Sequence, residues 1–207
     1  RTPLNAIVGF SDVLASGGSS EEDQRNYFRI IQSNSDLLLR LINDILDLSR
    51  LEANKVILTP EDCDVVQLCR QALSSVEMSR RESGNRFVFE TKTDSFVLQT
   101  DIQRLQQVLI NLLTNAAKFT KNGTITLQFE VEKEKNRVLF AVADTGCGIP
   151  KEKQKQVFER FEKLNEYAQG TGLGLSICKL TVDKWGGDIW IDPDYEGGAR
   201  FVVSHPL

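Results

Sequence analysis

Residues 101–120 read DIQRLQQVLINLLTNAAKFT, and their apolar residues recur at the spacing of a helix. Asn111, Asn115 and Lys118 stand four and three positions apart, so they share one polar face of that helix. Asparagine oxygens are hard ligands suited to Mg²⁺, which takes few protein ligands together with phosphate oxygens. Lys118 would then meet a phosphate beside the ion. A structural or solvated polar face explains the same pattern, and this helix alone leaves both interpretations open.

Two glycine-rich stretches follow this helix in the chain. Residues 144–148 read DTGCG directly after an apolar strand-like run, and residues 170–176 read GTGLGLS directly before a helical pattern. Glycines at the start of a helix let backbone N–H groups approach a phosphate, whose negative charge the helix dipole favours. A tight turn explains the second stretch about as well. That stretch has neither the glycine spacing of a dinucleotide-binding fold nor the Gly-Lys-Ser/Thr of a Walker loop.

The chain divides near Pro60, and the part before it predicts two helices. The first follows a helical apolar spacing over residues 4–14, and the second covers residues 26–53, with a capping box of Ser19 and Glu22 before it. The apolar stripe of the second helix is wider than an antiparallel hairpin can cover. The hairpin is therefore expected to pair with a second copy as a four-helix bundle, and packing on its own C-terminal domain is the alternative.

The part after Pro60 predicts a sheet covered by helices. Helical patterns occupy residues 64–81, 101–121 and 172–185, and strand-like runs occupy residues 86–90, 124–131, 137–143, 188–191 and 199–203. The polar turn at residues 133–136 makes a hairpin of two of these strands. The pattern predicts an α+β fold in which a two-layer α/β sandwich has helices on one face of a mixed sheet. A charged stretch over residues 149–169 is interpreted as a mobile lid.

Composition argues against several classes of function. Of 207 residues, 41% are hydrophobic and 26% are charged, which is typical of an ordinary globular protein. The net charge of −4 gives no sign of binding to nucleic acid or to an anionic membrane surface. The longest apolar run, residues 138–143, is far too short to cross a membrane, and no signal peptide is visible. No membrane contact by this chain is expected.

The cysteines do not indicate a metal site or a disulfide framework. They form no CxxC pair and have no histidine nearby, so a zinc site is not expected. They are Cys63, Cys69, Cys147 and Cys178. Buried free thiols in a reducing cytosol are the expectation. Because the chain opens on Arg1 rather than methionine, it is expected to be an excised piece of a longer protein.

Taken in order, four stretches resemble the N, G1, F and G2 boxes of sensor histidine kinases. They are residues 101–120, DTGCG at 144–148, FERF at 158–161, and GTGLGL at 170–175. RTPLNAI at 1–7 resembles the tail of the H box, and LINDILDLSRLEA at 41–53 resembles the second dimerisation helix of that family. The resemblance covers nearly the whole chain. It implies a dimerisation hairpin at residues 1–55 and a catalytic ATP-binding domain with an ATP lid at residues 56–207.

The resemblance also implies roles for individual residues. Asn115 would bind Mg²⁺, Lys118 would meet the phosphates of ATP, and Asn111 and Lys118 would serve catalysis. Asp144 would accept a hydrogen bond from the adenine amine. The remaining nucleotide contacts implied are Gly146 and Gly148 near the base, Lys163 at the γ-phosphate, and Gly170, Thr171, Gly172, Leu173 and Gly174 at the end of the lid. Phe158 and Phe161 would anchor the lid, or would pack as ordinary core aromatics beneath it.

The implied function is a cytoplasmic histidine kinase core with ATP and Mg²⁺ as cofactors. It would form a homodimer and pass the γ-phosphoryl group to a histidine three residues before Arg1, and then to the aspartate of a response-regulator receiver domain. His205, the only histidine in the sequence, is expected to be structural or solvent-exposed. Thr2 matches a residue that assists dephosphorylation in the family, and an ordinary helix residue is the equal alternative. Ala199 and Arg200 stand where many relatives carry Ser or Thr, which puts any hydroxyl contact near adenine from this strand in doubt.

Two other functions remain as alternatives. An ATPase switch related to gyrase, mismatch-repair proteins and Hsp90 would share the ATP site, but its members carry a Glu at the position of Asn111, and an amide cannot act as a general base. A non-catalytic nucleotide-binding scaffold is the second alternative.

Overall fold

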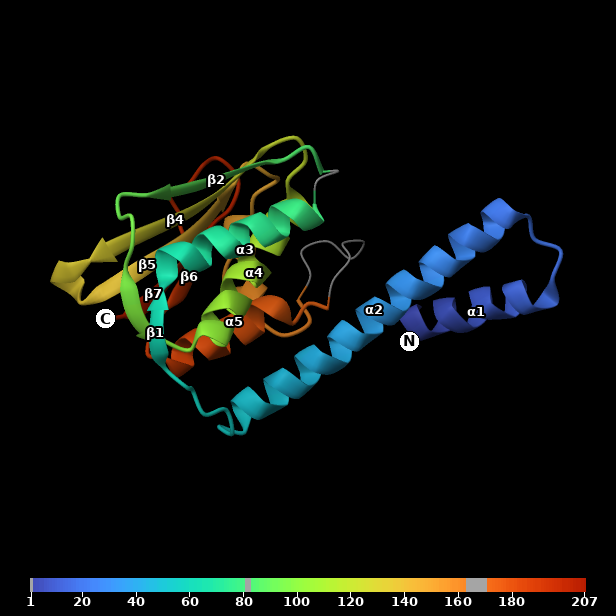
Figure 1. Ribbon diagram of the computed structural model, residues 1–207, viewed down its shortest axis with the longest axis horizontal. Coiled ribbons are helices and arrows are strands. Elements are labelled where there is room, and N and C mark those ends of the chain that lie inside the picture. The colour runs from blue at the N-terminus through green and yellow to red at the C-terminus, as the bar shows by residue number, and fades with distance from the viewer. Residues whose placement is uncertain (1, 81–82, 163–170) are drawn as a thin grey trace.

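The N-terminal part of the chain is an antiparallel helical hairpin. The computed structural model describes residues 2–80, 83–162 and 171–207, and α1 (Thr2–Ser16) folds back on α2 (Glu21–Glu52). Figure 1 shows the hairpin extending away from the rest of the molecule, with only the later turns of α2 reaching the α/β domain. The hairpin predicted from apolar spacing is thus present, and α2 starts five residues earlier than expected.

The predicted capping box at the start of α2 is wrong by one residue. Ser20 is the cap: its Oγ accepts a hydrogen bond from the backbone N–H of Asp23 at 3.2 Å and donates to the Asp23 carboxylate at 2.7 Å. Ser19 and Glu22 offer the same spacing. A helix that begins after Ser20 has Glu21, Glu22 and Asp23 in its first turn, where the helix dipole favours negative charge.

The C-terminal part is a mixed sheet with helices on one face, as predicted. Its elements are β1 (Glu61–Asp64), α3 (Val65–Ser79), β2 (Arg86–Thr91), β3 (Val97–Thr100), α4 (Ile102–Phe119), β4 (Thr124–Glu132), β5 (Arg137–Asp144), α5 (Gly174–Lys184), β6 (Ile189–Ile191) and β7 (Arg200–Pro206). The main sheet has the order β2-β4-β5-β7-β6, in which β2 and β4 are parallel and the other pairs antiparallel. Helices α3, α4 and α5 lie against one face of this sheet (Figure 1).

Two short strands escaped prediction. β1 and β3 pair antiparallel as a separate two-stranded sheet. Each has four residues, and β1 reads EDCD, a composition with little intrinsic preference for strands. The pairing brings the chain from the hairpin alongside the entry to α4.

The core lies between the main sheet and the three helices. Alternate residues of β4, namely Ile125, Leu127 and Phe129, are buried, and β5 is buried almost throughout. Helix α4 contributes its whole apolar face, which includes Leu105 and Leu109 with no exposed surface. Because one side of α4 is fixed in this core, its polar side lies toward α2 and α5.

The last turn of α2 packs on α5. Leu48 and Leu51 form a buried cluster with Leu173 and Ile177. The alternative that the hairpin packs on its own C-terminal domain is therefore correct for this end of α2. Large apolar side chains elsewhere on the hairpin are exposed: Leu4, Val8, Val13, Phe28, Leu39, Ile42, Ile45 and Leu46. The predicted four-helix bundle between two copies stays a prediction.

The cysteines and the histidine have clear environments. All four thiols are free, and Cys63, Cys69 and Cys178 are buried as expected, but Cys147 is exposed. The expectation of burial fails at Cys147 because it lies in the turn after β5, at the rim of the domain.

His205 is buried on β7, with one ring nitrogen 3.1 Å from the hydroxyl oxygen of Thr100, so its role is structural. Within the described residues, no helix is both long and apolar enough to cross a membrane.

Candidate nucleotide-binding site

Helix α4 carries the predicted metal and phosphate residues, and its start is firmly placed. Asp101 caps the helix by accepting a hydrogen bond from the N–H of Arg104 at 3.1 Å, and its second oxygen accepts from the N–H of Thr59 at 3.1 Å. Asn111, Asn115 and Lys118 are all partly buried on the side away from the core. The structure thus brings the three predicted residues onto one face, as their spacing indicated.

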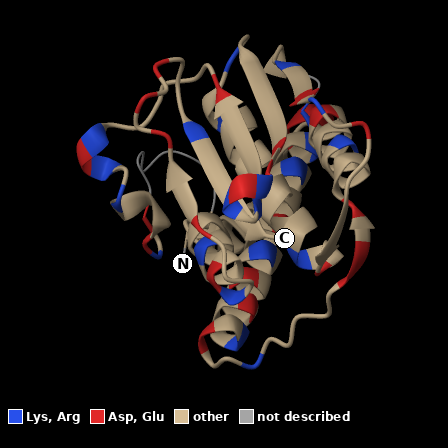
Figure 2. Cartoon of the chain, turned by 90° about the vertical axis from the view of Figure 1, so that its left-hand side faces the viewer, with Lys and Arg blue, Asp and Glu red and all other residues tan. Residues whose placement is uncertain are grey.

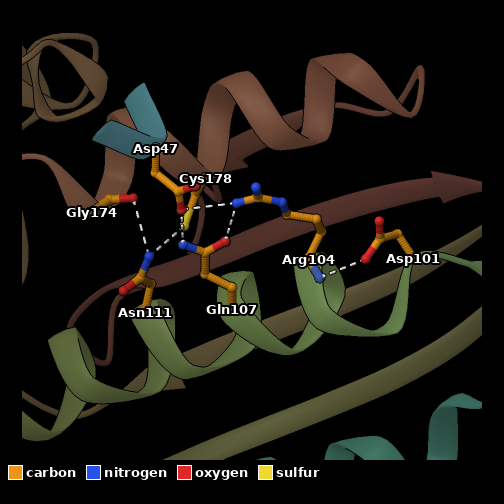
Figure 3. A network of polar contacts seen from close by, with 7 residues as sticks. All are labelled: Asp47, Asp101, Arg104, Gln107, Asn111, Gly174 and Cys178. Carbon is orange, nitrogen blue, oxygen red and sulfur yellow. Dashed lines mark hydrogen bonds and ion pairs between the residues drawn. The ribbon is translucent and has the colours of Figure 1, made fainter. Parts of the chain in front are cut away.

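Asn111 faces the start of α5. Its side-chain amide donates toward the backbone carbonyl of Gly174 at 3.5 Å and lies 3.7 Å from the sulfur of Cys178 (Figure 3). A Cβ atom added at Gly174 would lie 3.6 Å from the Asn111 amide, which is ordinary contact distance. The two motifs, whose residues Asn111 and Gly174 are 63 positions apart in the sequence, therefore meet here. The ammonium of Lys118, farther along α4, lies 4.7 Å from the ring centre of Phe119.

Asp144 ends β5 with a buried carboxyl group. Its Oδ1 accepts hydrogen bonds from the backbone N–H groups of Gly146 at 2.8 Å and Ala199 at 3.3 Å. Burial raises the pKa of Asp144, and these hydrogen bonds, together with the nearby Thr120 hydroxyl, only partly offset that effect. The hydroxyl of Tyr195 donates to the backbone carbonyl of Asp144 at 3.1 Å. The carboxyl group is thus held in a fixed orientation at the end of β5, the central strand of the sheet.

Two glycines after Asp144 are required by close packing. A Cβ atom at Gly146 would lie 2.4 Å from the backbone oxygen of Phe119, and Gly148 has a φ of +68° with the carbonyl of Gly198 close by. These contacts explain both glycines without a ligand. Their predicted part in admitting a base therefore stays a prediction. A cavity of about 400 Å³ lies beside this turn, lined in part by Ile149, Gly198 and Ala199.

The predicted end of the lid is held to both domains. Thr171 donates from its hydroxyl to the carboxylate of Asp44 on α2 at 2.7 Å. Gly172 has a φ of +73°, and its carbonyl accepts from the N–H of Phe161 at 2.9 Å. Leu173 is fully buried in the cluster with α2, so the structure gives it a packing role as well as the predicted nucleotide contact. Lys163 and Gly170, also predicted to contact the nucleotide, lie outside the described residues.

The two phenylalanines of the F box behave differently. Phe158 packs edge-on against Phe201, with ring centres 6.2 Å apart, so it is an aromatic of the core beneath the loop. Phe161 is 62% exposed and has a φ of +61°. Within the described residues, Phe158 makes its contact through its packed ring, whereas Phe161 makes its contact through the backbone N–H bonded to Gly172.

A polar network between α2 and α4 was missed by the sequence reasoning. One carboxylate oxygen of Asp47 accepts from Arg104 at 2.9 Å and from Gln107 at 2.8 Å (Figure 3). Burial of the Asp47 carboxyl opposes ionisation, but the hydrogen bonds and charge of Arg104 prevail, and the pKa of Asp47 is lowered. The available signal was the polar line along α4, where Arg104 and Gln107 precede Asn111 at helical spacing.

The donor set and the surface charge limit what the site can bind. Within the residues the structure describes, no group of three or more His, Cys, Asp or Glu side chains could hold a metal ion. A metal ion at α4 would therefore rest on an asparagine oxygen and on oxygens of the nucleotide itself, which fits Mg²⁺. Figure 2 shows acidic and basic residues interspersed along the chain, without one long basic segment in view.

Family models match both the helical hairpin and the α/β domain, in which a polar helix faces a glycine-rich helix start. Residues 100–207 match the model described as histidine kinase-, DNA gyrase B-, and HSP90-like ATPase, and residues 1–54 match the His Kinase A (phospho-acceptor) domain. The first match alone covers more than half of the chain. The chain therefore belongs to the histidine kinase-, DNA gyrase B- and HSP90-like ATPase family, and the predicted resemblance to sensor histidine kinases is confirmed.

Individual relatives agree with this assignment. The circadian input-output histidine kinase CikA of Synechococcus elongatus is 38% identical over the whole chain, which spans 28% of CikA. Among solved structures, full-length ShkA in complex with AMPPNP matches the whole chain with a TM-score of 0.78 and 31% identity, over 43% of ShkA. ThkA in complex with the response regulator TrrA matches it with a TM-score of 0.80 and 29% identity, over 58% of ThkA.

Proposed function

We propose that this chain is the kinase core of a two-component sensor, which binds Mg·ATP and phosphorylates a protein histidine. The observation that carries the proposal is the polar face of α4, where Asn111 meets the start of α5 and Asn115 and Lys118 continue the same face. The α/β domain is joined to a hairpin that matches a phospho-acceptor domain, and that domain is the protein substrate of the proposed kinase. The AMPPNP complex of ShkA supports an adenine nucleotide as the ligand.

Different residues of the site bind the metal ion, the phosphates and the base of the nucleotide. Asn115 holds Mg²⁺ through its side-chain oxygen, and Lys118 neutralises charge on the phosphates. Asp144 accepts from the exocyclic amine of adenine, which favours adenine over guanine because guanine presents a carbonyl at that position. Phosphoryl transfer asks mainly for positioning and charge stabilisation, so these residues suffice without a covalent intermediate on the ATP domain.

Transfer rather than hydrolysis follows from Asn111. In the ATPase-switch alternative, a carboxylate at this position activates water, whereas the Asn111 amide is directed at the Gly174 carbonyl and has no basic atom to offer. In the transfer step, the bond between the γ-phosphorus and the bridging oxygen breaks, a bond from phosphorus to an imidazole nitrogen forms, and ADP leaves. The proposed acceptor is the histidine that the resemblance to the H box implies three residues before Arg1.

The hairpin supplies the interaction surfaces of this function. Its exposed apolar residues, Leu39, Ile42, Ile45 and Leu46 among them, fit a homodimeric four-helix bundle. A response-regulator receiver domain is the second partner, in keeping with the ThkA–TrrA complex. We place the kinase core in the cytoplasm, where both ATP and such a regulator are found.

The experiment that tests the function follows the phosphoryl group. A chain extended at its N-terminus by the native residues that precede Arg1 is incubated with Mg²⁺ and ATP labelled at the γ-phosphate, and the expected product is an acid-labile, base-stable phosphoprotein mapped to the histidine before Arg1. The 207-residue chain, whose one histidine is the buried His205, should bind ATP without becoming labelled. A receiver domain added afterwards should remove the label. Rapid release of phosphate without phosphoprotein would favour the ATPase-switch alternative, and nucleotide binding without either product would favour the scaffold alternative.

A further inference from the structure

Thr120, at the end of α4, buries a hydroxyl group that has no hydrogen-bond partner among the described residues. The residue is 1% exposed, and only one other buried hydroxyl, that of Thr181, shares this condition within the described part of the chain. Buried polar groups are nearly always paired, because leaving one unpaired lowers stability. The backbone of Thr120 is fixed, since its carbonyl accepts from the side-chain amide of Asn85 at 2.8 Å.

The side chain of Thr120 is also fixed in direction. A Cβ atom added at Gly123 would lie 2.6 Å from the Thr120 methyl group, so the methyl points toward Gly123. A Cβ atom added at Gly146 would lie 2.9 Å from the Thr120 hydroxyl oxygen and 2.9 Å from Oδ1 of Asp144. The hydroxyl and the carboxyl group therefore border the same small space, and glycine at position 146 leaves that space open.

The Asp144 carboxylate has the capacity to accept a further hydrogen bond on this side. Its Oδ1 is held by two backbone N–H groups, from Gly146 and Ala199, and the residue at position 199 has no hydroxyl of its own. The Thr120 hydroxyl lies close enough to favour ionisation of Asp144, although it does not reach hydrogen-bonding geometry. The hydroxyl and the carboxylate are therefore an adjacent donor and acceptor that are not hydrogen-bonded to each other.

We propose that Thr120 is a positioning residue for base recognition, whose hydroxyl donates to the carboxylate of Asp144 when a purine bearing an exocyclic amine is bound. With the carboxylate held by these donors on one side, Oδ2 is left to accept from the amine. This inference rests on the proposed function, because it assumes that Asp144 reads adenine. In this arrangement Thr120, at the end of α4, supplies a hydroxyl group that Ala199 next to β7 does not have.

The test compares ATP with inosine triphosphate, which carries a carbonyl in place of the amine. Calorimetry is done on the full chain and on Thr120→Val, Thr120→Ser and Thr120→Ala. Loss of the hydroxyl in Thr120→Val should weaken ATP binding about tenfold, the scale of about 1.4 kcal/mol, and leave inosine triphosphate nearly unchanged. Thr120→Ser should retain the selectivity that Thr120→Ala loses. These two variants differ only by the hydroxyl, so their comparison tests the inference even where the valine variant folds poorly.

Two controls separate positioning from a structural effect. Thr181→Val removes the other unpaired buried hydroxyl, on α5, and should leave the selectivity for ATP unchanged. In an Asp144→Asn background, Thr120→Val should have no further effect on selectivity, because residues that act through one another are not additive.

The inference is overturned if Thr120→Val and Thr120→Ala keep the selectivity of the unchanged chain, if both nucleotides weaken equally, or if the effect persists in the Asp144→Asn background. Failure of the unchanged chain to bind ATP at all is a different result. It would overturn the proposed function, and the inference about Thr120 would fall with it.

Discussion

Asp44 of α2 accepts a hydrogen bond from the hydroxyl of Thr171 at 2.7 Å, across 127 positions of sequence. One helical turn later, Asp47 binds two side chains of α4. Burial raises the pKa of Asp44, and the hydrogen bond from Thr171 works against that shift. The second helix of the hairpin therefore touches both the end of the predicted lid and the helix that carries the predicted metal ligand.

Asp47→Asn should loosen the contact between α2 and α4. Hydrogen bonds to a charged group contribute about 1.5–3 kcal/mol, and the partial exposure of this pair reduces the expected loss to about 1 kcal/mol. Hydrogen–deuterium exchange should increase in the last turns of α2 and at the start of α5. Asp36→Asn, at an exposed site on the same helix, is the matched control. Unchanged exchange in Asp47→Asn would show that the network does not hold the two helices together.

The same contact should depend on acidity. The pKa of Asp47 in the folded chain is lowered from its ordinary value of 3.8. Its stabilisation is thus fully present above about that pH and is lost as the pH falls through the lowered pKa. Asp47→Asn should remove this part of the acid sensitivity, as measured by the unfolding midpoint between neutral pH and pH 3. An equal acid slope in both proteins would contradict the assignment.

Asn115→Ala should abolish the dependence of ATP binding on Mg²⁺, because the ion loses its one proposed protein ligand. Calorimetric titration with ATP, with and without Mg²⁺, measures this directly. Asn34→Ala removes another helical asparagine, whose amide bonds only within α2, and should leave the titration unchanged. Retention of full metal dependence in Asn115→Ala would place the metal elsewhere.

Asn111→Glu should increase ATP hydrolysis at the expense of phosphotransfer, because it supplies a carboxylate able to accept a proton from water. It also removes the amide that faces the Gly174 carbonyl, so some loss of nucleotide affinity is expected. Phosphate release and phosphoprotein are measured side by side in the chain extended to include the histidine before Arg1. Asn111→Gln, which keeps an amide, is the control. Brisk hydrolysis by the unchanged chain would instead favour the ATPase-switch alternative.

His205 should make the stability of the α/β domain fall in mild acid. Burial lowers the pKa of His205 from its ordinary value of 6.5, so the unfolded chain takes up a proton more readily than the folded one. Stability is then fully present above pH 6.5 and declines as the pH falls below it. His205→Gln should flatten this decline, as measured by thermal unfolding at pH 8 and pH 5. The same decline in the variant would show that other groups cause it.

The long elements and the ATP-site motifs were predictable because their signals are local. Asn111, Asn115 and Lys118 share a face by simple helical spacing, and β4 and β5 alternate or are apolar throughout. What the sequence could not show depends on contacts between distant segments. The four-residue strands β1 and β3 exist only as a pair, and Asp44 and Asp47 become significant only when α2 packs beside α4 and α5.

Helix α2 takes part in two separate packing units. Its early turns meet α1, while Leu48 and Leu51 cover Leu173 and Ile177, which have at most 1% of their surface exposed. A cleavage between residues 55 and 56, however natural that point looks in the chain, would strip this cover from α5. The released α/β fragment would carry a fresh apolar patch and should self-associate more readily than the intact chain.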